Sequence, residues 1–189
     1  GDALPRQRAV AGGDWVQVPV PAGVAAVSLL RQPAVAAAGS GLDAAAAGAA
    51  VEQPVHLEPL AAAGGARCWR LSNGRLQVDL GPEGVRQLWG EDGRPQLAAP
   101  LQWCRWRDQG EFWDAWDLAA DYREHPLPLQ WEPGPELVEQ GPLCTRLVWR
   151  GRCGSSALRL GVQLRAACPW LELNLSVDWR QRHELLRLE

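Results

Sequence analysis

Aromatic and acidic residues gather in one stretch of the chain, EFWDAWDLAADY, which spans residues 111–122. It holds two Trp, four carboxylates, and the only Phe and the only Tyr of the protein. The flat faces of Trp113 and Trp116 could stack on a sugar ring. Asp114 and Asp117 could accept hydrogen bonds from its hydroxyl groups. These four residues are therefore the predicted substrate-binding residues.

The same stretch also has a structural interpretation, which we favour. Its aromatic side chains would fill a core between a sheet and a neighbouring domain, and its aspartates would cap a turn or pair with Arg105 or Arg107. Catalysis by these aspartates alone is not expected. A retaining glycosidase needs two carboxyl groups about 5 to 5.5 Å apart on opposite sides of the scissile bond. Asp114 and Asp117 would point the same way from one local turn, so no catalytic residue is predicted.

Histidine and cysteine give no pattern typical of a metal site. His56, His125 and His183 are isolated and show neither HxH nor HExxH spacing. The five cysteines are widely scattered and form no CxxC pair. We therefore expect no metal and no cofactor in this chain, and free thiols in a reducing cytosol.

Composition narrows the class of partner. The chain has 189 residues, is 47% hydrophobic and carries a net charge of -3, and all nineteen of its basic residues are Arg. No basic stripe is present, so nucleic acid is not an expected partner. No apolar run reaches the roughly 20 residues of a membrane helix, and no signal peptide is visible. The sequence predicts a folded, soluble protein.

Two-residue periodicity dominates the C-terminal half. Leu158 to Leu164 and Leu171 to Val177 each place apolar side chains on alternate positions, and Trp179 extends the second apolar face into the predicted core. Leu143 to Trp149 shows the same alternation. Short connections containing Gly or Pro separate these three runs, which favours an antiparallel meander. The predicted fold class is all-β.

The first part of the chain is organised differently. Residues 76–89 read as a hairpin with a turn at residues 81–84. WVQVPVP is strand-like, but its prolines confine it to an edge, and the Ala/Gly-rich segment after it predicts a loop. A boundary near Gly64 or Gly65 is expected, with a small β module in residues 1–65 and the main sandwich domain in residues 66–189.

Four blocks in order carry a family resemblance. They are LSNGRLQVDLGPEGVRQLW, FWDAWDLAADY, EQGPLCTRLVWRG and VDWRQRHELLRLE. Together they resemble the region that follows the catalytic domain in glycoside hydrolase family 38 α-mannosidases, most of all the cytosolic/vacuolar-type branch. Within the last block only His183 matches the family by position. A strand end with solvated charges, among them Arg182 and Glu184, is the favoured interpretation there, and an interdomain polar patch is the other.

The resemblance implies an antiparallel β-sandwich of the galactose-mutarotase-like supersandwich type, preceded by a small β module and truncated at the C-terminus. It implies that the zinc ion (or a similar divalent metal) and the nucleophilic Asp lie in a catalytic barrel outside this chain. The intact enzyme would be a cytoplasmic retaining glycosidase that hydrolyses α-linked mannose. The expected partners are the protein's own N-terminal catalytic domain and an α-mannoside, and an exposed interface could drive formation of a homo-oligomer.

Two other functions remain open. The chain could be an autonomous carbohydrate-binding β-sandwich, for which an exposed aromatic pair is expected. It could also be an aldose-epimerase-like enzyme, which would need an acid/base pair such as His and Glu on a concave face. The small number of His residues disfavours the second.

Overall fold

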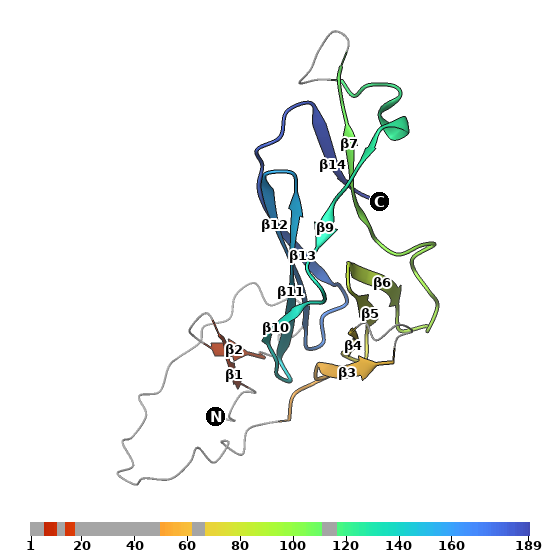
Figure 1. Cartoon of the computed structure of the whole chain (residues 1–189). Helices are drawn as coiled ribbons and strands as arrows, with labels where there is room; N and C mark the ends of the chain where they lie inside the picture. The colour runs from red at the N-terminus through yellow and green to blue at the C-terminus, as the bar shows by residue number, and fades with distance from the viewer. Residues whose placement is uncertain (1–5, 11–13, 18–49, 62–66, 111–116) are drawn as a thin grey trace, which may run out of the picture.

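The computed structural model describes residues 6–10, 14–17, 50–61, 67–110 and 117–189, and nearly all of its regular structure is antiparallel β (Figure 1). The only described helix is the short 3-10 helix η2 (Tyr122–Glu124). The prediction of an all-β fold is confirmed.

The larger sheet has five strands in the order β10-β11-β12-β13, with β9 also paired to β11. They are β9 (Gln130–Trp131), β10 (Glu136–Glu139), β11 (Cys144–Cys153), β12 (Ser156–Arg165) and β13 (Glu172–Asp178). The meander predicted from the alternation of apolar residues is confirmed as β11, β12 and β13. The register places Leu147 opposite Val162, and Leu160 opposite Leu175, so the apolar positions share one face.

The second sheet has four strands in the order β3-β4-β5-β6. They are β3 (His56–Leu60), β4 (Cys68–Ser72), β5 (Gln77–Gly81) and β6 (Gly84–Trp89). The predicted hairpin is β5–β6, whose turn needs Gly84 because φ there is +125° and an added Cβ would lie 3.4 Å from Leu160. Strand β3 precedes the boundary expected near Gly64 but pairs along its length with β4. The division into two domains stays a prediction.

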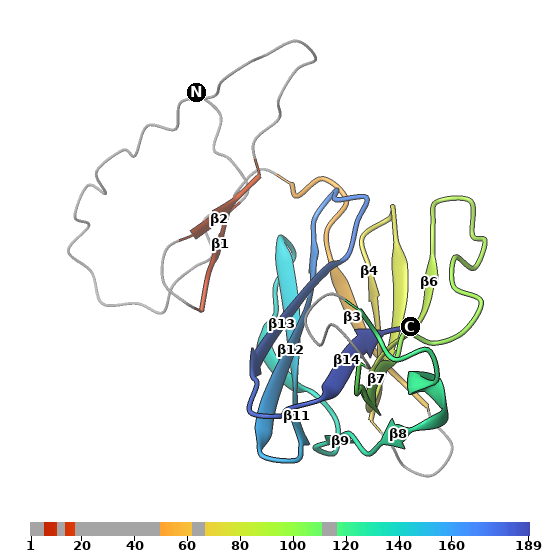
Figure 2. The same cartoon turned by 90° about the horizontal axis from the view of Figure 1, so that it is seen from above.

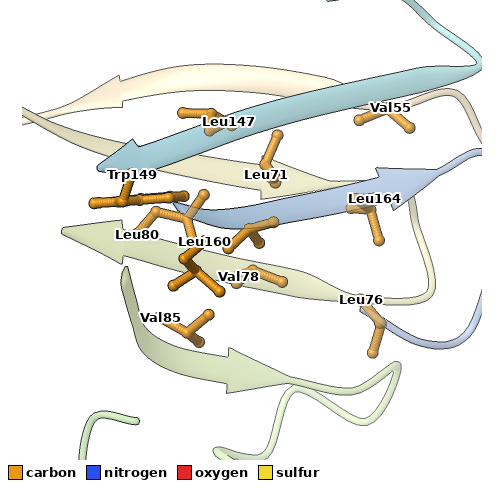
Figure 3. Close-up of a cluster of buried hydrophobic side chains, with 11 residues drawn as sticks. Val55, Leu71, Leu76, Val78, Leu80, Val85, Leu147, Trp149, Leu160 and Leu164 are labelled. Atoms are coloured by element: carbon orange, nitrogen blue, oxygen red, sulfur yellow. The ribbon is translucent and has the colours of Figure 1, made fainter. Parts of the chain in front are cut away.

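The two sheets pack face to face and form a β-sandwich (Figure 2). Its core is a set of buried apolar side chains from both sheets (Figure 3), and it consists of Val55, Leu71, Leu76, Val78, Leu80, Val85, Leu147, Trp149, Leu160, Val162 and Leu164. Trp149 also joins the sheets by a hydrogen bond, because its Nε1 donates to the carbonyl oxygen of Gly81 at 2.9 Å. A buried indole N–H is thus satisfied inside the core.

A fully buried Asn73 makes a second link between the sheets. Its Nδ2 donates to the carbonyl oxygens of Arg165 (2.7 Å), at the end of β12, and of Cys168 (2.8 Å), in the loop that follows. Its Oδ1 accepts from the backbone N–H groups of Arg75 (3.1 Å) and Leu76 (2.9 Å) in the turn before β5. This single side chain therefore holds a local turn and a distant loop together.

A third, smaller sheet has the order β14-β7-β8, formed by β7 (Trp103–Arg107), β8 (Pro126–Leu127) and β14 (Glu184–Leu188). In Figure 1 it lies above β5 and β6. Arg105 and Glu184 join β7 to β14 by two hydrogen bonds of 2.6 and 2.7 Å, and Arg105 also donates to the carbonyl oxygen of Pro128. The two side chains are only 7% and 15% exposed. This pair is a buried salt bridge that fixes the sheet.

Two expectations for the C-terminal block were wrong. Glu184 is not a solvated charge, because it begins β14 and pairs with buried Arg105. Trp179 is not in the core, since its side chain is 38% exposed. It follows β13, which lies at the end of the strand order and has a neighbour on one side only among the described strands.

An N-terminal hairpin of β1 (Arg6–Arg8) and β2 (Asp14–Val16) packs beside β10 and β11. Gln7 accepts from the backbone N–H groups of Leu143 and Cys144 (2.8 and 2.9 Å) and donates to the carbonyl oxygen of Cys144. Buried Glu139 accepts hydrogen bonds from Gln7 and from the Trp15 indole. The prolines of WVQVPVP and the Ala/Gly-rich segment lie outside the described residues.

Candidate functional site

Of the four predicted binding residues, the structure describes Asp117 alone, which lies between β7 and η2. Trp113, Asp114 and Trp116 lie outside the described residues, whereas Asp117 is described and exposed. Asp117 lines a hollow of about 790 Å³. The other lining residues are Arg107, Gln109, Leu118, Ala119, Ala120, Asp121 and His125.

Hydrogen bonds with Arg107, at the end of β7, and with the next residue, Asp108, hold the loop that carries Asp117. The carboxylate of Asp108 accepts a hydrogen bond from the backbone N–H of Ala119 at 2.8 Å. The backbone N–H of Arg107 donates to the carbonyl oxygen of His125 at 2.9 Å, and that of Asp108 donates to the carbonyl oxygen of His183 at 2.8 Å. The hollow is therefore a formed part of the fold, although its side chains are open to solvent.

Tyr122 also holds the loop that carries Asp117. Its ring packs edge-on against Trp106, with ring centroids 5.6 Å apart. Its hydroxyl oxygen accepts hydrogen bonds from Arg187 (2.5 Å) and Arg123 (3.0 Å). The bond to Tyr122 raises the pKa of the Arg123 guanidinium, which stays charged. The only Tyr of the chain thus has a structural role beside the hollow.

Four polar residues that line the hollow were not predicted from the sequence as binding residues. They are Arg107, considered only as an ion-pair partner, together with Gln109, Asp121 and His125. His125 and Asp121 form an exposed pair with 3.2 Å between Nε2 and Oδ2. The two residues are four positions apart and flank η2, and this spacing was the signal that could have found them. Arg105, proposed as an ion-pair partner of the aspartates, pairs instead with Glu184.

The hollow combines hydrogen-bond acceptors, donors and a small apolar surface. Asp117 and Asp121 offer carboxylate oxygens, Arg107 and Gln109 offer N–H donors, and the alanines between them are apolar. Such a surface suits a ligand with many hydroxyl groups. Among the described residues no group of three His, Cys, Asp or Glu side chains could hold a metal ion. In that same part of the chain, no helix combines the length and apolarity that crossing a bilayer requires.

A comparison with known protein families identifies the chain. Residues 71–189 match the C-terminal domain of the glycosyl hydrolases family 38. The chain belongs to this family. The matched residues begin in β4 and include β5 to β14, so they contain most of the sandwich and the whole hollow.

Two relatives carry the same printed name, Alpha-mannosidase 2C1, one from Homo sapiens and one from Mus musculus. Each is 27% identical to this chain over 126 residues. The match covers 63% of this chain but 12% of each relative, so the chain spans a small part of their length. The resemblance seen in the four sequence blocks is thereby confirmed at the level of the family.

Proposed function

We propose that this chain is a non-catalytic β-sandwich region of an α-mannosidase, which supports the catalytic domain and edges its cleft for α-linked mannose. The observation that carries the proposal is the family match, which begins in β4 and continues through β14. The intact enzyme is proposed to be a retaining, zinc-dependent glycosidase of the cytosolic/vacuolar-type branch. A cytoplasmic location is supported by five cysteines that are all free thiols.

The donor groups in the described part of the chain do not fit the zinc site of such an enzyme, since they include no suitable group of three ligands. The metal and the nucleophilic Asp are therefore proposed for the catalytic domain, and no step through a metal is assigned to this sandwich. Asp117 and Asp121 are two exposed carboxylates on one loop. A retaining site needs two carboxyl groups that flank the bond to be broken. We therefore assign no catalytic role to these two carboxylates.

The hollow beside Asp117 is the proposed edge of the cleft. The Asp117 carboxylate would accept a hydrogen bond from a mannose hydroxyl, and Arg107 and Gln109 would donate to hydroxyl oxygens. Trp113, Asp114 and Trp116 are proposed to extend this surface as a stacking platform. The catalytic domain would cover the hollow from the other side, as the partner of this region.

A chimera tests the supporting role. The segment of human Alpha-mannosidase 2C1 that matches this chain is replaced by the corresponding residues of this chain, and hydrolysis of 4-nitrophenyl α-mannoside is measured. We expect the chimera to retain hydrolysis and a version with the segment deleted to lose it. A deleted version that stays folded and fully active would contradict the proposal.

The role of Asp117 is tested within the same chimera. Asp117→Ala should raise KM about tenfold with little change in kcat, because it removes a hydrogen bond made equally in ground and transition states. Asp92→Ala is the matched control, since Asp92 is an exposed carboxylate on the turn after β6, away from the hollow. Equal effects of the two substitutions would exclude a role for Asp117 in binding.

The second candidate is an autonomous carbohydrate-binding module. It is favoured by one observation: Asp117 and most of the other residues that line the hollow are exposed to solvent. The two functions differ in one property, which is affinity of the isolated chain for mannosides. Assembly into a homo-oligomer stays a further proposal.

A further inference from the structure

The outer face of the five-stranded sheet presents a group of arginines. Arg150 and Arg152 lie on β11 and Arg159 lies on β12, and all three side chains are exposed. They alternate with core residues such as Trp149 and Leu160, so they point away from the sandwich core. Figure 2 shows that this face turns away from the β3–β6 sheet.

The protein balances the charges on this face only in part. Arg150 is the direct cross-strand neighbour of Arg159, and like charges in that position repel. Arg150 has a partner, because its Nη2 lies 3.1 Å from Glu136. Among the described residues, Arg152 and Arg159 have neither a hydrogen-bond nor an ion-pair partner. Two guanidinium groups on rigid neighbouring strands therefore remain available.

These arginines surround a hollow of about 510 Å³. Its floor carries small side chains, Ala157 and Ser176, and Ser176 is the neighbour of Arg159 on β13. Arg152 and Arg159 are diagonal neighbours across β11 and β12, so their Cα atoms are about 7 to 8 Å apart and both long side chains can reach one group between them. The Ser176 hydroxyl adds a neutral donor.

The rim of the hollow limits the size of the ligand. Glu132 and Asp178 also line it, and their carboxylates would repel an extended polyanion such as a nucleic acid. A single compact group with two negative charges can lie between the two guanidinium groups, whereas an extended chain of phosphates would also have to pass the carboxylates. Arginine forks match the geometry of phosphate oxygens and bind them with two parallel hydrogen bonds.

We propose that this outer face is a binding site for the phosphate group of a small phosphate monoester, held by Arg152 and Arg159 with help from Ser176. The site shares no residue with the hollow beside Asp117, so it does not depend on the function proposed above. It would give the sandwich a ligand of its own on the face opposite the core.

Titration with inorganic phosphate tests this proposal. The arginine Nε–H signals of the full, isotope-labelled chain are followed by NMR as phosphate replaces chloride at constant ionic strength. We expect saturable shifts of a few arginine signals, and acetate should bind more weakly because it carries one charge. The Arg152→Ala/Arg159→Ala variant should weaken binding about tenfold or more.

Two further variants sharpen the test. Arg94→Ala removes an exposed arginine from the loop after β6 and should leave phosphate binding unchanged. Arg159→Lys keeps the charge but loses the fork, and should weaken binding by less than the double substitution. Shifts that grow without saturation, or that are the same in the double variant, would overturn the proposal. Acetate binding as tight as phosphate would overturn the choice of a phosphate group.

Discussion

At the scale of single residues, Asn73 connects parts of the fold that no strand pairing joins. Its four hydrogen bonds all go to backbone groups, and it is fully buried. We expect Asn73→Ala to lower the free energy of unfolding by about 3 kcal/mol, because it leaves several buried polar groups unpaired. Denaturant unfolding measures this loss. An Asn73→Ala variant as stable as the parent would show that water replaces these bonds.

Cys144 makes the stability depend on pH in the alkaline range. It is fully buried, and burial, with a contribution from Glu139, raises the pKa of its thiol from 9.0 to about 12. Above pH 9 the unfolded chain releases this proton while the folded chain keeps it. Stability should therefore fall as the pH rises from 9 towards 12, by up to about 1.4 kcal/mol per pH unit for one proton.

All basic side chains are Arg and the chain has one Tyr, but the four other Cys thiols also titrate in the alkaline range, so the effect of Cys144 is read from a variant that lacks it. Denaturant unfolding is repeated at several alkaline pH values for the parent and for Cys144→Ala. The parent should lose stability with pH more steeply than the variant. Equal slopes in both proteins would mean that the Cys144 thiol is not protected by the fold.

At the scale of elements, the buried pair of Arg105 and Glu184 fixes β14 to β7. We expect Glu184→Ala to cost about 3 kcal/mol of stability, since it leaves a buried guanidinium without its carboxylate. Arg105→Met combined with Glu184→Leu should recover most of that loss. Denaturant unfolding of the single and double variants gives the coupling between the two side chains.

Glu189→Ala is the control for this pair. Glu189 makes an exposed salt bridge with Arg123 at 3.3 Å, and such contacts contribute about 0 to 1 kcal/mol. A loss for Glu184→Ala no larger than for this control would show that the Arg105 pair does not stabilise the sheet.

The alternation of apolar residues predicted the central strands because each of them buries one face. Leu160 and Val162 on β12, for example, lie in the core while Arg159 faces solvent. Strands β7 and β14 were not predicted, since their stability depends on a pairing between residues 79 positions apart. Local periodicity carries no information about such a contact.

The candidate site was only partly predictable for a related reason. Asp117 was found from the composition of its segment, whereas Arg107 and His125 join it through the contact of β7 with the chain beyond η2. Asn73 was also not recognised, because nothing in its sequence neighbourhood shows that it becomes buried. Side chains that gather by long-range packing cannot be read from spacing alone.

At the scale of the whole molecule, the sandwich is held to its N-terminal hairpin by polar contacts. Gln7 and Trp15 reach Glu139 and the start of β11, and the glycine at position 141 leaves room for the Gln7 side chain. In Figure 1 the hairpin lies at the opposite end of the fold from strands β7 and β14. Among the described residues, the hairpin contributes nothing to the lining of the hollow beside Asp117.

The central claim is that this sandwich shapes a sugar site only together with a catalytic domain. The most direct test is titration of the isolated, folded chain with mannose and short α-mannosides, followed by Trp fluorescence and backbone-amide NMR. The account predicts no saturable change, because the open hollow supplies one side of the site only. Saturable binding with millimolar or tighter affinity would contradict it and would make the chain an autonomous carbohydrate-binding module.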